Sequence, residues 1–296
     1  MMFSGAEITY VQLFLGALLL GGLYALVAVG LALIFGVMRI LNIAHGEFII
    51  LSAYITYWLS QTYRLDPLLT IILTIPIASL VGFVTYSAVI RGVTKSFDAP
   101  IVSSFGILLI LQSSMLIAWS GDPRSIVTPF TADSLVLGPY LLPLVRLIAF
   151  VVSVLALTSL HVFLNNTHLG RAIKAVSQDS EAASTLGIPV SRIQSLTFAL
   201  STGLAGLAGG LLSLLLSFTP TLGPEYLLKA FVILALSGIG NIPALLIGGL
   251  VLSIGETYGS FFLGSGLRNV VAYIMLVLIL LLRPAGLFGN LKEREV

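Results

Sequence analysis

The sequence predicts an all-α polytopic membrane protein, and composition, hydropathy and the spacing of charged residues all support this fold class. Of the 296 residues, 58% are hydrophobic and only 9% are charged, whereas about a quarter of a soluble domain is charged. The mean hydropathy of +1.10 exceeds what one globular core can bury, so lipid must surround much of the chain. This pattern excludes a soluble enzyme.

Charge and cysteine content exclude further classes. The formal charge of +2 comes from 14 basic and 12 acidic residues, which are too scattered to indicate nucleic-acid binding. Because the chain has no cysteine, disulfides, thiol catalysis and cysteine metal sites are excluded. The three histidines, His45, His161 and His168, lack the H-E-x-x-H spacing of a zinc hydrolase. We therefore expect no catalytic residue, no metal site and no cofactor.

Membrane helices are expected in the uncharged runs, because a charged residue at the centre of a span costs about 2.5 to 3.5 kcal/mol. Most of the runs can hold a helix of about 20 residues. The first is too long for a signal peptide and no basic residue precedes it, so we interpret it as a true span. In chain order the runs are 8–38, 48–63, 67–90, 99–121, 147–170, 193–224, 230–255 and 269–282.

Basic residues in short loops indicate which ends of the spans face the cytoplasm. They occur at 91–95, within 170–192 and at 292–294. We therefore expect a cytoplasmic C-terminus, an external N-terminus and external loops at 63–67 and 121–140. An even number of crossings must then follow the loop 170–192.

A helix break in the last third of the chain satisfies this parity. The run 230–255 contains Gly238-Ile239-Gly240-Asn241-Ile242-Pro243, and Gly and Pro are the residues that permit an interruption. Two short helices here give nine crossings, which we prefer. A single helix gives eight crossings and an external C-terminus.

A polar segment follows the first run and leaves no room for an ordinary loop. Arg39, Asn42, His45 and Glu47 lie between two apolar runs. The pattern is typical of a broken helix whose free backbone groups need a protein or water-lined environment. Ionisable groups at membrane depth indicate a functional site.

Two interpretations of this segment remain open. In the first, Asn42, His45 and Glu47 line a translocation pathway together with Gly238 and Asn241 of the later break. In the second, the charged residues of the segment sit at the headgroup interface and Asn42 caps the next helix.

A similar but weaker pattern occurs at 211–225. There, as in the polar segment after the first run, an apolar span leads through a Gly-containing turn to an acidic residue, Glu225. The two stretches would run in opposite directions, which is typical of an inverted repeat with broken helices near the midplane. Glu225 and Lys229 are four residues apart, the spacing of an interfacial ion pair.

A stripe of small residues, Gly203, Gly206, Gly209 and Gly210, lies along one side of the run 193–224. Membrane helices associate through such close approach. We expect this face to pack inside the protein, or else against a second subunit.

The cytoplasmic loop 165–192 predicts a short helix of about two turns. Ser177 or Asp179 can cap its start, Glu181 favours the positive end of the helix dipole, and Gly187 ends it. The loop is part of one transmembrane domain that spans residues 1–296. Its small residues allow a partner to approach closely, although a linker helix on the membrane surface has the same composition.

The loop resembles a known motif. Glu181, Ala182, Ala183 and Gly187 match the E-A-A-x-x-x-G signature of ABC importer permeases. The stretch from Asn42 through Glu47 and the ending Arg283-Pro-Ala-Gly-Leu-Phe-Gly resemble the branched-chain amino acid permeases, specifically the LivH-type subunit. The resemblance covers about residues 13–289.

This resemblance implies a fold similar to type II ABC importer permeases and import of branched-chain amino acids across the bacterial inner membrane. It implies a second, similar permease, two cytoplasmic ATPases that dock on the E-A-A loops, and a periplasmic amino-acid-binding protein. Residues 181–183 and 187 would form the coupling helix. The chain itself has no G-x-x-x-x-G-K-[ST] phosphate loop, so ATP hydrolysis would occur on the separate subunits.

Two other functions remain as alternatives. An ion-coupled secondary transporter would use Glu47, His45 or Glu225 as a proton or sodium site and would need no ATP. Permeases for urea and short amides share parts of the same sequence patterns.

Overall fold

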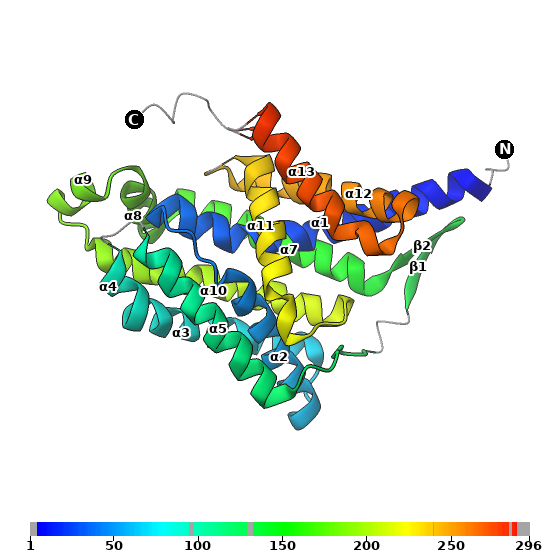
Figure 1. The fold of residues 1–296 in the computed structure, drawn as a ribbon, viewed down its shortest axis with the longest axis horizontal. Helices are drawn as coiled ribbons and strands as arrows, with labels where there is room; N and C mark the ends of the chain where they lie inside the picture. The colour runs from blue at the N-terminus through cyan, green and yellow to red at the C-terminus, as the bar shows by residue number, and fades with distance from the viewer. Residues whose placement is uncertain (1–4, 95–97, 129–132, 239, 284–285, 289–296) are drawn as a thin grey trace.

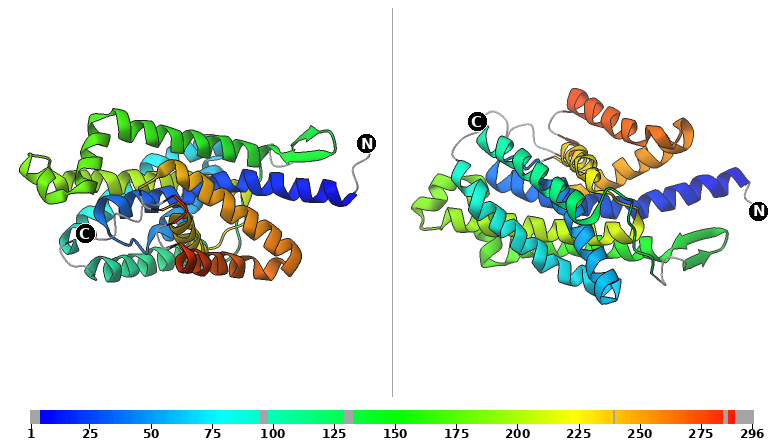
Figure 2. Two further views of the ribbon diagram at one scale, coloured as in Figure 1. Left: turned by 90° about the horizontal axis from the view of Figure 1, so that it is seen from above. Right: turned by 60° about the horizontal axis from the view of Figure 1, so that its bottom comes forward.

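A computed structural model describes residues 5–94, 98–128, 133–238, 240–283 and 286–288, and it is mostly helical (Figure 1). Three long helices, α1 (Gly5–Met38), α7 (Leu144–Asn166) and α10 (Val190–Leu215), run along the long axis of the molecule (Figure 2). Helix α1 contacts both of the others and also α12 (Ile242–Leu263). Its residues from Leu23 to Ile34 are almost completely buried, so α1 forms the centre of the bundle.

Part of the first half packs against α10. Helix α2 (His45–Tyr63) and helix α3 (Pro67–Thr85) both contact α10. Asp66 caps α3 by accepting a hydrogen bond from the backbone N–H of Leu68 at 2.8 Å. A π-helical turn η1 (Tyr86–Ile90) and the short α4 (Arg91–Val93) continue α3, and α5 (Ala99–Trp119) follows.

The last third begins with a 3₁₀ turn η2 (Pro220–Leu222) and helix α11 (Gly223–Ser237), which crosses α1 near the middle of the molecule (Figure 1). After α12, the turn η3 (Ser265–Leu267) leads into α13 (Arg268–Leu282). The predicted break between the two short helices is confirmed, because α11 ends at Ser237 and α12 begins at Ile242. Gly238 and Gly240 adopt positive φ angles of 80° and 87°, which glycine tolerates; Ile239 lies outside the described residues.

Seven helical segments among the described residues are long and apolar enough to cross a membrane. They contain α1, α3, α5, α7, α10, α12 and α13. Helices α2 and α11 are not among them, and the prediction of eight or nine crossings is not confirmed. At 15 residues, α11 measures about 22 Å, less than the hydrocarbon thickness of about 30 Å.

A short β-hairpin corrects the all-α prediction. Strands β1 (Ser134–Leu137) and β2 (Tyr140–Pro143) pair antiparallel. Strand β1 lies in the predicted external loop 121–140, and β2 begins at the last residue of that loop. Gly138, with φ of 59°, provides the turn. The hairpin and the N-terminal end of α1 lie at one end of the molecule, and α8 (His168–Gln178) and α9 (Ser180–Thr185) lie at the opposite end (Figure 1).

The glycine stripe of α10 packs inside the chain, as the first of its two interpretations predicts. A Cβ atom at Gly206 would lie 2.8 Å from the Cβ of Ala78 in α3, and one at Gly210 would lie 2.8 Å from the side chain of Ile71. Gly209 lies directly against the backbone carbonyl of Ile49 in α2. These glycines allow α2 and α3 to approach α10 closely.

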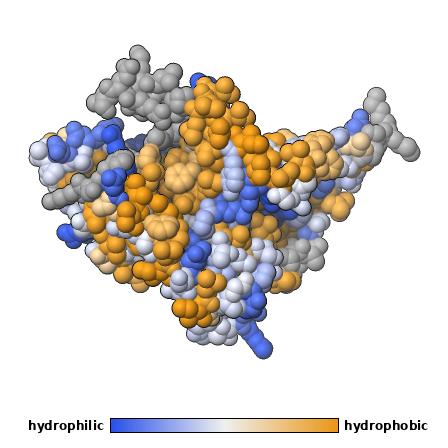
Figure 3. Space-filling view, viewed as in Figure 1, coloured by the Kyte–Doolittle hydropathy of each residue, from blue (hydrophilic) through white to orange (hydrophobic). Residues whose placement is uncertain are grey.

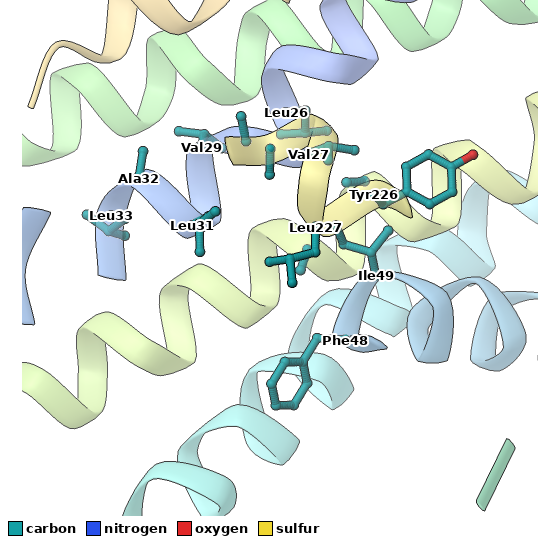
Figure 4. Close-up of a cluster of buried hydrophobic side chains, with 14 of the residues drawn as sticks. Leu26, Val27, Val29, Leu31, Ala32, Leu33, Phe48, Ile49, Tyr226 and Leu227 are labelled. Carbon is teal, nitrogen blue, oxygen red and sulfur yellow. The ribbon is translucent and has the colours of Figure 1, made fainter. Parts of the chain in front are cut away.

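The apolar core draws on most of the helices, and part of it lies where α1, α2 and α11 meet. Figure 4 shows side chains of α1 between Leu26 and Leu33 near Ile49 of α2 and Leu227 of α11, all of them buried. Large apolar residues also cover much of the outer surface, as Figure 3 shows. An apolar core with an apolar exterior is expected of a protein that lipid surrounds.

Candidate functional site

The expected coupling helix is α9, and its start matches the sequence prediction. Asp179 is the N-cap residue, and its Oδ1 accepts hydrogen bonds from the backbone N–H groups of Glu181 and Ala182, both at 2.9 Å. This satisfies two of the donors that the first turn leaves free. Helix α8 holds the base of the loop, where Thr167 accepts a hydrogen bond from the N–H of Gly170 at 3.0 Å.

The end of α9 also matches the prediction. Gly187 has a φ of 82°, and the N–H of Ile188 donates to the carbonyl of Ala183 at 3.0 Å. A Cβ at Gly187 would meet open space, so the left-handed backbone, and not crowding, favours glycine here.

The surface of the loop points away from the bundle. Glu181, Ala182 and Gly187 are exposed, and the apolar Leu186 is 81% exposed. Ala183 instead faces inward and is buried, although the sequence analysis placed it on the surface that a partner approaches. The face left open for a partner therefore consists of Glu181, Ala182 and the apolar end at Leu186.

The polar segment between α1 and α2 is deep in the protein. Asn42, His45 and Glu47 expose 1%, 0% and 0% of their surfaces, so the side chain of Glu47 is covered by protein. Arg39, in contrast, is exposed and has a φ of 53° where α1 ends. The Oδ1 atom of Asn42 accepts a hydrogen bond from the N–H of Ala44 at 3.2 Å, one residue before α2 begins.

The N-terminus of α2 meets the N-terminus of α11. Gly46 lies so close to the backbone of Gly223 that a Cβ at Gly46 would collide with the carbonyl of Gly223. A Cβ at Gly223 would in turn collide with the carboxyl group of Glu47. The polar segment before α2 and the similar segment before α11 are therefore in direct contact. Two helix N-termini, each with partial positive charge, meet in the interior.

Several polar atoms at this junction have no hydrogen-bond partner among the described residues. They are Nδ2 of Asn42, Nδ1 of His45 and both carboxyl oxygens of Glu47. The other ring nitrogen of His45 lies 2.9 Å from the carbonyl oxygen of Val27. Buried polar groups without partners are rare and often mark a site.

The second half of the predicted pathway lies elsewhere. Gly238 and Asn241 are at the far end of α11, away from the junction of Gly46 with Gly223. The side chain of Asn241 caps α12 by accepting a hydrogen bond from the N–H of Ala244 at 3.2 Å. The structure thus brings Asn42, His45 and Glu47 together with the start of α11, and not with the break at its end.

A buried ionic network was missed by sequence reasoning. Lys229 of α11 lies 2.9 Å from Oε1 of Glu256 in α12 and 3.3 Å from Glu225. Nε of Arg268, in α13, donates to Oε2 of Glu256 at 3.0 Å. The hydroxyl group of Tyr24, in α1, donates to the same oxygen at 2.6 Å.

The sequence contained only part of the signal for this network. Glu225 and Lys229 form the expected i,i+4 pair, but Lys229 is only 3% exposed, so the pair is not simply interfacial. Glu256 and Arg268 lie just outside the last two apolar runs, where charges are ordinary. Only the folded chain brings together α1, α11, α12 and α13.

The described residues offer no metal site, since no three His, Asp or Glu side chains group there as metal ligands would. The site is instead a set of polar and charged groups inside an apolar helical bundle, with an exposed capped helix at one end. Such an arrangement suits transport of a solute more than covalent chemistry.

Comparison with known proteins agrees with this architecture. Residues 13–280 match the family model described as the branched-chain amino acid transport system / permease component. The chain is 30% identical to the high-affinity branched-chain amino acid transport system permease protein BraD of Pseudomonas aeruginosa, over 97% of this chain and 98% of BraD. It is 28% identical to the corresponding LivH protein of Escherichia coli, again over 97% and 98% of the two chains.

A solved structure shares the fold. A chain of PsaBC from Streptococcus pneumoniae, solved in complex with Fab, matches with a TM-score of 0.52 at 13% sequence identity and covers 95% of this chain and 96% of its own. The sequence match extends over nearly the whole length and includes the polar junction and the capped loop. The chain therefore belongs to the family of permease components of branched-chain amino acid transport systems.

Proposed function

We propose that the chain is the permease subunit of an ATP-driven importer that moves branched-chain amino acids into the cytoplasm. Two cytoplasmic ATPases, a second permease of similar fold and a periplasmic binding protein complete the assembly in the bacterial inner membrane. The N-terminus is external and the C-terminus is cytoplasmic. The observation that carries the proposal is α9, a capped helix that presents Glu181, Ala182 and the exposed Leu186 at one end of the membrane bundle.

The contacts of the loop explain how α9 can act as a lever. Helix α9 contacts α8 and α10, and α8 contacts both α1 and α10. Helix α1 in turn contacts α11. Movement of α9, driven by closure of the ATPases, therefore reaches the junction of α2 and α11 through packed helices, which move as units because interiors are close-packed.

The pathway itself is proposed to pass the broken helices. Asn42, His45 and Glu47 supply polar groups at the junction, and Gly238 and Asn241 keep α11 short at its other end. If α2 and α11 are counted as crossings, the chain crosses the membrane nine times. Their converging N-termini are the counterparts expected of an inverted repeat.

Substitution of Glu181 by Lys tests the coupling assignment. A lysine at the start of α9 places a positive charge at the positive end of the helix dipole and on the face offered to the ATPase. We expect loss of radiolabelled leucine uptake by cells, together with loss of ATPase co-purification, while the permease still inserts into the membrane.

Asn166→Lys is the matched control, because Asn166 is exposed on the same end of the molecule but outside α9. Uptake and co-purification should be unchanged in this variant. Normal ATPase binding by Glu181→Lys, combined with leucine uptake that needs no ATP, would overturn the proposed function in favour of an ion-coupled carrier.

A further inference from the structure

Two charged residues of the network keep part of their surface open. The side chains of Glu225 and Arg268 are 28% and 33% exposed. Helix α11, which carries Glu225, crosses α1 far from both ends of the molecule (Figure 1). Figure 3 shows hydrophilic side chains over this crossing, within a largely apolar face. Because charge facing lipid is strongly unfavourable, this part of the surface must face water or another protein.

The two exposed residues are the open ends of the buried network. Lys229 and Glu256, only 4% and 0% exposed at the side chain, form the pair between them. Oε1 of Glu225 contacts Lys229 at 3.3 Å, and Nε of Arg268 contacts Glu256 at 3.0 Å. The network therefore has one negative and one positive residue with open surface at its two ends, linked through Lys229 and Glu256.

Both open ends retain unused hydrogen-bonding capacity. Arg268 uses Nε toward Glu256 and Nη2 toward the hydroxyl oxygen of Tyr24, the latter at 2.9 Å. Its Nη1 has no partner among the described residues, and the same is true of Oε2 of Glu225. A guanidinium group with a free fork matches a carboxylate, and a free carboxylate oxygen matches an ammonium group.

We propose that Arg268 and Glu225 bind the charged head group of a free amino acid during translocation. Arg268 takes the carboxylate, and Glu225 takes the ammonium group. This inference rests on the proposed function and assigns its substrate site. Lys229, Glu256 and Tyr24 are positioning residues: Lys229 donates to the hydroxyl oxygen of Tyr24 at 3.0 Å, which holds the buried side of the network together.

The chemistry fits an importer of hydrophobic amino acids. A zwitterion needs one cation and one anion in place of its hydration shell, while its side chain needs only an apolar wall. That wall is available beside Arg268, where α13 exposes Val270, Ile274 and Val277. In the assembled importer the second permease would cover the open surfaces of Glu225 and Arg268, so that the site forms between the two subunits.

Equilibrium binding to the full permease–ATPase complex, without the binding protein, tests the site. The probes are radiolabelled leucine, and as competitors L-leucinol, which lacks the carboxylate, and 4-methylpentanoate, which lacks the ammonium group. We expect saturable leucine binding to wild type. In Arg268→Gln, affinity for leucine and 4-methylpentanoate should fall by at least about tenfold, while affinity for leucinol stays unchanged.

Glu225→Gln should show the reverse selectivity. Its affinity for leucine and leucinol falls by at least about tenfold, while that for 4-methylpentanoate is unchanged. If Arg268→Gln does not assemble, Arg268→Lys takes its place in the test. This variant keeps the positive charge and should retain much of the leucine affinity. Arg64→Gln, an exposed arginine where α2 ends, is the matched control and should bind all three like wild type.

The outcomes separate this site from the proposed function. Equal loss of all three ligands in both variants would show a purely structural network, and absence of saturable leucine binding to wild type would also overturn the site. ATP-dependent leucine uptake by the wild-type complex, with its binding protein, is measured in parallel. If that uptake persists while the binding results fail, only the head-group site is wrong; if uptake is absent, the proposed function fails.

Discussion

At the scale of single residues, charged side chains inside the helical bundle are the central feature. Glu256 is completely buried and has three partners, Tyr24, Lys229 and Arg268, that come from three different helices. A buried ion pair contributes little net stability, but removal of one partner leaves an uncompensated charge. The network therefore specifies how α1, α11, α12 and α13 pack, more than it stabilises them.

Replacement of Lys229 by Met should destabilise the folded protein by about 3 kcal/mol, because Glu256 then loses its closest cation. The double variant Lys229→Met with Glu256→Gln should recover a large part of this loss. The stability of both variants is measured by thermal unfolding of the purified protein, with size-exclusion chromatography as the readout. A double variant less stable than the single one would contradict this view of the network.

The sequence alone predicts the cap and the end of α9, but not the ionic network. The capping of α9 by Asp179 and its end at Gly187 depend on neighbours within eight residues, so local rules suffice. The ionic network joins Tyr24 to partners 205 and 244 residues away. No local pattern contains such separations, which is why sequence analysis found only the pair Glu225–Lys229.

At the scale of helices, the two broken elements α2 and α11 organise the interior. Each begins inside the protein, and their N-termini touch at Gly46 and Gly223. The sequence identified the polar segment and the later break, but it paired Asn42–Glu47 with Gly238–Pro243. Hydropathy shows where a helix is interrupted, but not which interruption meets which, because that depends on tertiary packing.

The predicted count of eight or nine crossings is not confirmed for a related reason. An apolar run indicates a helix in a membrane protein, but it does not show whether that helix crosses the membrane or lies across other helices. Helix α11 crosses α1 near the middle of the molecule (Figure 1). The β-hairpin was missed because each of its strands has only four residues. Such short strands carry little periodic signal.

The glycine stripe of α10 leads to a prediction at this scale. Gly206→Leu should prevent folding or assembly, because α3 lies 2.8 Å from where its Cβ would be and overpacking of a tight helix contact is unfavourable. Gly106→Leu in α5 is the matched control, since a Cβ there meets nothing within 4 Å. Membrane yield, monodispersity and leucine uptake should fall in the first variant and stay normal in the second.

Equal behaviour of the two glycine variants would contradict the close α3–α10 contact. This outcome would also reopen the view that the stripe of Gly203, Gly206, Gly209 and Gly210 contacts a second subunit. The structure favours internal packing because α2 and α3 of the same chain already occupy that face.

At the scale of the whole molecule, the two ends have different roles. The hairpin and the start of α1 form one end, and α8 and α9 form the other (Figures 1 and 2). Between them, packed helices connect the exposed Leu186 loop to the broken helices and the ionic network. We propose that ATPases acting on α9 drive solute movement through this polar interior.

Leucine uptake into proteoliposomes tests this claim most directly. The complete complex and its binding protein are reconstituted with ATP on the α9 side, and uptake is compared with ATP, with a non-hydrolysable analogue, and with ionophores that collapse ion gradients. We predict uptake that requires ATP hydrolysis and persists with the ionophores. Uptake by the permease alone, driven by an ion gradient and abolished by the ionophores, would contradict ATP-driven transport.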